Sequence, residues 1–207
     1  MKTSTVTRKQ ELLEHRLEIE DLFFNSFGQR ALGNVWDWAY LDNPNGEPVV
    51  SLCYDEGRLV GHYAIVPMPV SCKGINKRSY VSMTTMVAES HRKFGLFTQL
   101  AQECYRIAAE SGVDFVFGFH NSQSMPGFRK RLDWILPESD YVATIDKATL
   151  LAVAKAGSFD KTGLLGLDLN NPIIRAWRLS RPGSTYIFEH GLAYKRHHDT
   201  IDLLWWD

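Results

Sequence analysis

The hydrophobic pattern of this chain changes its period near Gly95, and this change limits the folds that the chain can adopt. Before Gly95, residues 49–54 and 59–66 are apolar runs of strand length joined by the turn residues 55–58. Two such runs around a glycine-containing turn indicate a β-hairpin. After Gly95, apolar residues recur at helical spacing, at Phe97, Leu100, Cys104, Ile107 and Ala108. Strands followed by an amphipathic helix predict an α/β fold.

Two further segments belong to the same unit. Residues 8–27 place apolar side chains near helical spacing, and Gly28 stands where it can end a helix. We therefore expect one amphipathic helix there. Residues 80–87 are rich in Val, Thr and Met and follow the turn 73–77, so they predict a third strand. The three strands would form an antiparallel meander.

The chain after the central helix continues the alternation of strand and helix. Residues 113–119 form an apolar run next to a glycine, which is typical of a buried strand. Ser124 is expected to cap a short helix that tolerates Pro126 in its first turn. The prediction is an α/β fold with a mixed, largely antiparallel central sheet flanked by helices. This sheet would open between the strands that end at Val87 and begin at Val113.

The C-terminal part is less regular. Residues 141–156 predict a strand followed by a short helix. Beyond them, Trp177 and a Pro-Gly turn precede a hairpin, an order similar to the one that follows Trp38. We expect a domain over residues 1–145 and an extension over residues 146–207. The extension is either the start of a second copy of the first domain or a set of additional strands of the first sheet.

Composition excludes several classes of function. A formal net charge of −1 and a pI near 6.7 do not indicate the basic surface that nucleic acids require. The first 30 residues contain no long apolar run, so they predict neither a signal peptide nor a membrane span. Three cysteines without a CxxC pair favour a reduced, cytoplasmic setting. His197 and His198 would point to opposite faces of a strand, so we expect no structural metal.

The junction before the central helix is the motif that carries chemistry. A strand ending at Val87 leads into the basic loop 91–95, and the helix starts at Leu96. The first amides of a helix lack acceptors within the helix, and the helix dipole favours an anion. Arg92 and Lys93 add positive charge at this place. The junction therefore predicts a phosphate-binding turn.

This junction and the order of elements resemble the GNAT superfamily of acyltransferases. The acyl-CoA motif of that family is Gln or Arg, two residues, Gly, one residue, then Gly or Ala. Arg92 and Gly95 match the first two anchors, and Phe97 stands in place of the small residue. The resemblance covers roughly residues 8–145. It implies acetyl-CoA or another acyl-CoA as the co-substrate.

The resemblance also assigns binding roles. The backbone at Met86 and Val87 would pair with the pantetheine arm like an added strand. Asn121 would bind a pantetheine amide or order the splay between the two strands. The turn would cradle the pyrophosphate through its amides and basic side chains, at Arg92, Lys93, Phe94, Gly95, Leu96, Phe97 and Thr98.

Residues 118–134 are similar, more narrowly, to GNAT-like acyltransferases that act on nucleotide-linked amino sugars, some of which have two GNAT-like halves. Many GNAT enzymes use a tyrosine in the last helix as the acid for the leaving thiolate. Here Phe128 or Arg129 occupies that region. A water, Ser122 or Ser124 would then assist the thiolate, or it would leave without help from a side chain.

His120 is the candidate catalytic base, because it follows a buried strand and stands beside Asn121. An imidazole titrates near neutral pH and can take a proton from an ammonium nucleophile directly or through water. The other interpretation is a structural hydrogen-bonding histidine. His62 is a weaker candidate, interpreted as a paired residue of the sheet. Trp38 would line an acceptor pocket by stacking on a sugar or base, or would be ordinary core structure.

The sequence thus predicts an acyl-CoA-dependent N-acyltransferase. It would move an acetyl or other acyl group to a primary amine of a small molecule by direct attack, and a nucleotide-linked amino sugar is one expected acceptor. Two alternatives stay open: a non-catalytic CoA-binding GNAT-like module, and a protein or peptide N-acetyltransferase. Neither nucleic acid nor a membrane is an expected partner, and a homodimer is left open.

Overall fold

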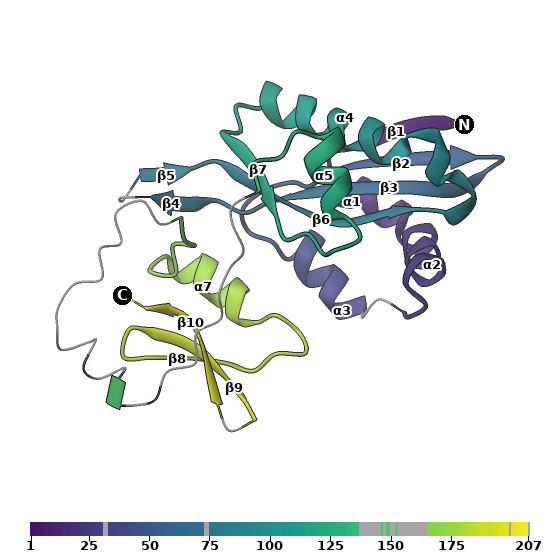
Figure 1. The fold of residues 1–207 in the computed structure, drawn as a ribbon. Helices are drawn as coiled ribbons and strands as arrows, with labels where there is room; N and C mark the ends of the chain where they lie inside the picture. The colour runs from purple at the N-terminus through teal and green to yellow at the C-terminus, as the bar shows by residue number, and fades with distance from the viewer. Residues whose placement is uncertain are drawn as a thin grey trace.

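The central sheet of the computed structural model has five strands in the order β1-β2-β3-β6-β7 (Figure 1). The structure describes residues 1–30, 33–72, 75–136, 146, 148–149, 152, 165–198 and 200–206. Neighbouring strands are antiparallel except β6 and β7, which pair in parallel, so the predicted mixed sheet is confirmed. The strands are β1 (Lys2–Val6), β2 (Val49–Asp55), β3 (Arg58–Pro67), β6 (Ser79–Val87) and β7 (Phe115–Gly118).

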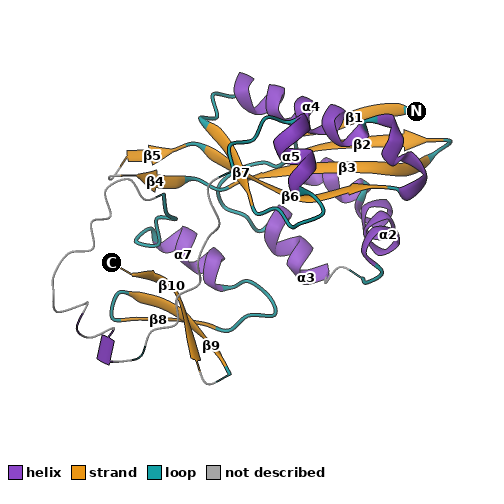
Figure 2. Ribbon diagram, viewed as in Figure 1, coloured by secondary structure: helices purple, strands orange, loops and turns teal. Residues whose placement is uncertain are grey.

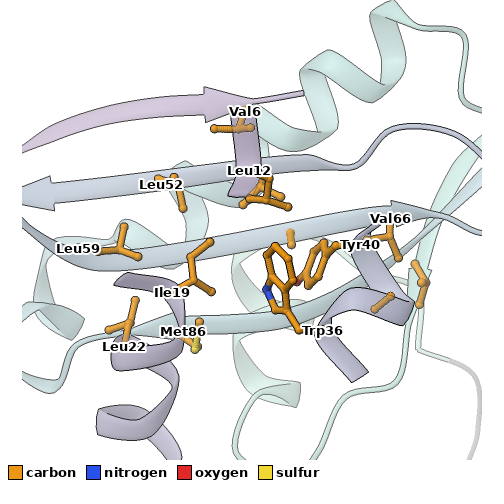
Figure 3. Close-up of a cluster of buried hydrophobic side chains, with 14 residues drawn as sticks. Val6, Leu12, Ile19, Leu22, Trp36, Tyr40, Leu52, Leu59, Val66 and Met86 are labelled. Carbon is orange, nitrogen blue, oxygen red and sulfur yellow. The ribbon is translucent and has the colours of Figure 1, made fainter. Parts of the chain in front are cut away.

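Helices cover both faces of this sheet (Figure 2). Helix α4 (Leu96–Glu110) packs on one face, and α1 (Lys9–Glu14) and α2 (Arg16–Phe27) pack on the other. Because side chains alternate along a strand, Tyr63 of β3 lies in the cluster under α4 and Ala64 in the cluster under α2. Figure 3 shows the second cluster, where side chains of α2 point toward those of the sheet.

The single helix expected over residues 8–27 is wrong, because the structure has two helices that meet at His15. The Nδ1 atom of His15 lies 2.8 Å from the Tyr54 hydroxyl, which donates to Glu18 at 2.6 Å. This contact holds His15 against β2 and favours the break. Gly28 ends α2 in the left-handed conformation, with φ 69°, as predicted.

Strand β1 was not predicted. Residues 3–5 are polar, so no hydrophobic alternation marks this segment. It lies at the edge of the sheet and pairs with β2 from Lys2 opposite Tyr54 to Val6 opposite Val50. An edge strand has one partner and buries few side chains, which explains its weak pattern.

Residues 89–94 form a 3-10 helix, η2 (Glu89–Phe94), where the sequence predicted a loop from residue 91. Helix α4 begins at Leu96 as predicted. Helix α5 (Met125–Arg131) follows Ser124, also as predicted, but the Ser124 side chain does not cap it. Its Oγ atom accepts the N–H of Asn121 at 3.1 Å instead, because the turn folds back on itself.

The C-terminal strands form a separate antiparallel sheet in the order β10-β9-β8 (Figure 1). Helix α7 (Pro172–Leu179), which was not predicted, precedes them and is capped by the side chain of Asn171. Most of residues 141–156, where a strand and a helix were expected, lie outside the described residues. The remaining elements are α3 (Gly33–Trp36), the π-helix η1 (Asp37–Leu41), the hairpin of β4 (Val70–Cys72) and β5 (Ile75–Lys77), β8 (Tyr186–Glu189), β9 (Leu192–His197) and β10 (Thr200–Trp206).

Membrane insertion of a helix requires a long apolar segment. Within the described ranges, none of the helices has both the length and the apolar character for this.

Candidate functional site

The central sheet opens between β6 and β7. These strands pair only from Ser79 opposite Phe115 to Ser82 opposite Gly118, whereas β6 continues to Val87. After Ser82, the β7-facing edge of β6 has no strand partner among the described residues. An unpaired strand edge offers N–H and C=O groups to a ligand that lies along it. Met86 and Val87, the expected pantetheine contacts, belong to this open segment, and the Met86 side chain is buried.

A β-bulge interrupts the open segment. On the β3 side, Met83 pairs with Ala64 and Met86 pairs with His62, so two residues of β6 stand opposite Tyr63 alone. A bulge of this kind bends the strand and increases its twist. The bend falls at the start of the edge that β7 leaves uncovered, where a ligand between the strands would lie.

The open segment leads through η2 to the glycine turn. Gly95 has φ 72°, and a Cβ added to it would meet no atom within 4 Å. A ligand can therefore approach the backbone at the first turn of α4, whose earliest amides have no acceptor within the helix. Arg92 and Lys93 are exposed and form no ion pair within the described part of the chain. The contact of this turn with a phosphate group stays a prediction.

Phe97 does not fill the glycine turn. Its ring packs edge-on against Phe128 of α5 at 5.3 Å between centroids, and against Tyr63 of β3 at 6.0 Å. A Cβ on Gly127 would lie 3.1 Å from the Phe97 ring, so Gly127 makes room for it. The large side chain at this position of the family motif is accommodated between α4 and α5, and the helical backbone from Leu96 through Thr98 is kept.

The loop after β7 places the remaining predicted residues. Asn121 Oδ1 accepts the N–H groups of Gln123 at 3.1 Å and Ser124 at 2.9 Å, so this side chain orders the turn into α5. Asn121 and Ser122 are exposed, and His120 is half-buried. No hydrogen bond joins the His120 imidazole to another described residue. Their roles in binding and catalysis stay predictions.

A half-buried chain of hydroxyl groups, which sequence reasoning missed, lies where β6 and β7 diverge. Ser82 Oγ donates to the Tyr63 hydroxyl at 2.8 Å, and the hydroxyls of Tyr63 and Tyr105 are 2.5 Å apart. Trp134 Nε1 donates to the Tyr105 hydroxyl at 3.1 Å. Burial raises the pKa of both tyrosines, so they stay protonated. These hydrogen bonds link β3, β6, α4 and the segment after α5. A local sequence pattern could not predict them, because the partners are far apart in the sequence.

Gly118 ends the paired part of β7. A Cβ at this position would lie 3.1 Å from the Trp134 ring and 3.3 Å from the Ser82 carbonyl oxygen. The glycine therefore allows the tight packing at the point of divergence, a role that its position beside an apolar run does not reveal.

Trp38 lies at the contact with the C-terminal part. Its ring stacks on that of Trp177, with centroids 4.8 Å apart and planes 9° apart. One face of the Trp38 indole is thus used within the chain, and its expected stacking on an acceptor stays a prediction. The guanidinium groups of Arg178 and Arg181 lie 6.0 and 5.9 Å from the Trp38 ring.

Solved structures share the fold of this chain at low sequence identity. A putative acetyltransferase from Agrobacterium tumefaciens str. C58 superposes with a TM-score of 0.52 and 10% identity, over 69% of this chain and 99% of the other. An aminoglycoside acetyltransferase from an uncultured soil metagenomic sample, in complex with trehalose, has a TM-score of 0.51 and 14% identity over 70% and 96%. These similarities concern the fold alone. A comparison with curated protein sequences finds no match.

The sequence itself matches a family model. The acetyltransferase (GNAT) domain model covers residues 14–136, which is more than half of the chain and includes the opened sheet and the glycine turn. GNAT acetyltransferases use acetyl-CoA as their co-substrate. The chain therefore belongs to the GNAT acetyltransferase family and is a GNAT-type N-acyltransferase.

Proposed function

We propose that this protein transfers an acetyl or other acyl group from acyl-CoA to a primary amine of a small molecule. The observation that carries the proposal is the continuous path from the open edge of β6 after Ser82 to the turn at Gly95. Pantetheine amides would pair with the strand edge at Met86 and Val87. The pyrophosphate would meet the α4 amides beside Arg92.

The reaction is a direct attack. The amine nitrogen forms a bond to the thioester carbon, the C–S bond breaks, and CoA leaves as a thiolate that takes up a proton. His120 would accept the proton of the ammonium nucleophile, directly or through a water. Ser122, Ser124 or a water would relay the second proton of the attacking nitrogen to the thiolate, so that the amide forms and the relaying group regains its own proton. The task of the protein is then to position the two substrates and to move protons.

We further propose an acceptor that carries an anionic group, with a nucleotide-linked amino sugar as the first compound to test. The similarity of residues 118–134 to that subgroup supports it. The half-buried guanidinium groups of Arg178 and Arg181 near Trp38 add support, because they form no ion pair among the described residues.

Calorimetry and a thiol-release assay test these proposals. Acetyl-CoA should bind the chain, and thiol should appear only when an acceptor is added. The acceptor panel contains amino sugars, nucleotide-linked amino sugars, polyamines and peptides. Binding without thiol release from any acceptor would support the non-catalytic module, and release with peptides alone would support a peptide acetyltransferase. Absence of acetyl-CoA binding would refute the proposal.

The C-terminal part, we propose, is the start of a second copy of the first domain. Trp38 and Trp177 exchange hydrogen bonds as equivalent residues of two related units would. The hairpin turns also match. Glu56 and Gly57 have φ 47° and 77°, and His190 and Gly191 have φ 50° and 74°. Size-exclusion chromatography with light scattering would show whether the protein is a monomer or a homodimer, which the sequence left open. A monomer is expected if the contact between the two parts of one chain replaces a contact between two chains.

A further inference from the structure

His62 of β3 makes an unusual contact with the bulge of β6. Its Nδ1 atom lies 2.6 Å from the backbone carbonyl oxygen of Thr84. A carbonyl oxygen can only accept a hydrogen bond, so Nδ1 carries the proton and Nε2 of the neutral ring carries a lone pair. The side chain is completely buried. Burial lowers the pKa of His62 to about 4, which keeps the ring neutral at neutral pH.

Thr84 adopts a backbone conformation that needs outside support. Its φ is 51°, in the left-handed region that β-branched residues avoid. Such a conformation persists only where neighbouring contacts hold it. The hydrogen bond from His62 engages the carbonyl of this residue, and so it holds the bulge in its observed form.

The bulge is placed where its shape matters for a ligand. Ser82 is the last β6 residue that pairs with β7, and Thr84 lies two residues after it. Beyond the bulge, β6 continues to Met86 and Val87 with its β7-facing edge uncovered by any described strand. The direction of this edge, and of the amides and carbonyls along it, is therefore set by the bulge.

The other ring nitrogen of His62, Nε2, does not take part in holding the bulge. Nε2 of His62 is buried and has no hydrogen-bond partner within the described residues. A buried acceptor without a partner costs free energy, which a leucine of similar size would avoid. The contact of Nδ1 with Thr84 is thus the feature that distinguishes histidine from an apolar residue at this position.

We propose that His62 is a positioning residue, which fixes the bulge at Thr84 and thereby aligns the open edge of β6 with the acyl end of acyl-CoA. This inference rests on the proposed function. Because the glycine turn lies apart from the bulge, His62 should affect the reaction more than the binding of the pyrophosphate.

Three substitutions separate the two ring nitrogens. His62→Asn places an amide N–H where Nδ1 stands, His62→Gln places a polar atom near Nε2, and His62→Leu removes both. We expect kcat to fall about 30-fold in His62→Leu and His62→Gln, because small misplacements of reacting groups cost up to about 100-fold. His62→Asn should stay within about threefold of the wild type, and the acetyl-CoA Kd should change less than about threefold in all three.

Thr84→Gly provides the matched test of the partner residue. Glycine adopts a positive φ without strain, so the bulge then needs less support from His62. In the Thr84→Gly background, His62→Leu should reduce kcat only about threefold, and this non-additivity would place the two residues in one unit. Thermal unfolding of each variant establishes that it is folded, and the Asn and Gln variants keep the comparison valid if His62→Leu is not.

The outcomes are distinct. Wild-type activity in all three His62 variants would overturn the inference while leaving the proposed function intact. Activity in His62→Gln but not in His62→Asn would make Nε2 the working atom and would also overturn it, as would full additivity with Thr84→Gly. A wild-type protein that neither binds acetyl-CoA nor releases thiol would refute the proposed function and this inference together.

Discussion

Trp38 and Trp177 hold each other through two reciprocal hydrogen bonds. The indole N–H of Trp38 donates to the Trp177 carbonyl at 2.7 Å, and the indole N–H of Trp177 donates to the Trp38 carbonyl at 2.9 Å. Their rings are stacked nearly in parallel. The pair joins the segment around η1 to α7, 139 residues along the chain, and so ties the C-terminal part to the GNAT domain.

Trp177→Phe should loosen this tie. Phenylalanine keeps an aromatic ring but loses the N–H, which leaves the Trp38 carbonyl without its partner and should lower the free energy of unfolding by about 1–2 kcal/mol. Amide hydrogen exchange in residues 165–198 should become faster. Trp134→Phe is the control, because it removes the bond to Tyr105 and not the tie. If Trp177→Phe and Trp134→Phe showed equal exchange rates in residues 165–198, the pair of Trp38 and Trp177 would not be what holds the C-terminal part.

Gly95→Ala should separate backbone strain from ligand binding. Gly95 precedes α4 and has φ 72°, and Gly28 follows α2 and has φ 69°. A methyl group added at either position would meet no atom within 4 Å. Alanine at either position should therefore cost about 1 kcal/mol of stability. Only Gly95→Ala should also weaken acetyl-CoA binding, by about tenfold, because its methyl group would meet the phosphates. Denaturant unfolding and calorimetry measure the two effects, and equal affinities would speak against a phosphate at this turn.

The charges of η2 can be tested by reversal. Arg92→Glu together with Lys93→Glu should reduce affinity for acetyl-CoA at least about tenfold at low salt, and less at high salt, because salt screens exposed charges. The matched control reverses Arg129 and Lys130 of α5, which are also exposed. A larger loss in the control pair would move the main phosphate contact to α5.

His120→Ala should reduce kcat about 100-fold with little change in the acetyl-CoA Kd, since a positioned base contributes at least this much. The rate should also lose part of its dependence on pH. His120→Gln, which keeps hydrogen bonding without a basic nitrogen, should be equally slow. If either variant keeps the wild-type rate and pH profile, His120 is not the base.

Stability should depend on pH through His62. Burial lowers its pKa from 6.5 to about 4, so the unfolded chain binds a proton at a pH where the folded chain does not. The free energy of unfolding should therefore fall as pH decreases from 6.5 to 4, by about 3 kcal/mol from this residue. His62→Asn removes the contribution. The free energy of unfolding of the wild type minus that of His62→Asn, measured by denaturant at several pH values, should decrease as the pH falls from 6.5 to 4. A difference that stays constant over this range would disprove the contribution of His62.

Much of the fold could be predicted from local patterns of apolar residues and glycines in the sequence. The hairpin of β2 and β3, the start of α4 at Leu96 and the existence of the strand β7 were predicted correctly, because each depends on the spacing of neighbouring apolar residues and on a nearby glycine. The expectation that this strand is buried was wrong, because β7 lies at the edge of the sheet and its residues are half-buried. The glycine turn could be predicted for the same reason. Gly95 stands between a basic segment and an amphipathic helix, and its φ of 72° is the left-handed conformation that glycine commonly takes at the end of a helix, here η2.

What depends on contacts between distant residues could not be read in this way. The polar edge strand β1, the hydroxyl chain from Ser82 to Trp134, and the pair of Trp38 and Trp177 arise only when separate segments meet. The bulge at Thr84 is held by His62 from the neighbouring strand. The sequence by itself thus determined the hairpin of β2 and β3, the strands β6 and β7, the helix α4 and the glycine turn before it, through interactions a few residues apart. Only the tertiary structure decided how the sheet opens, because the packing of β3, α4 and α5 against β6 and β7 sets where the two strands diverge.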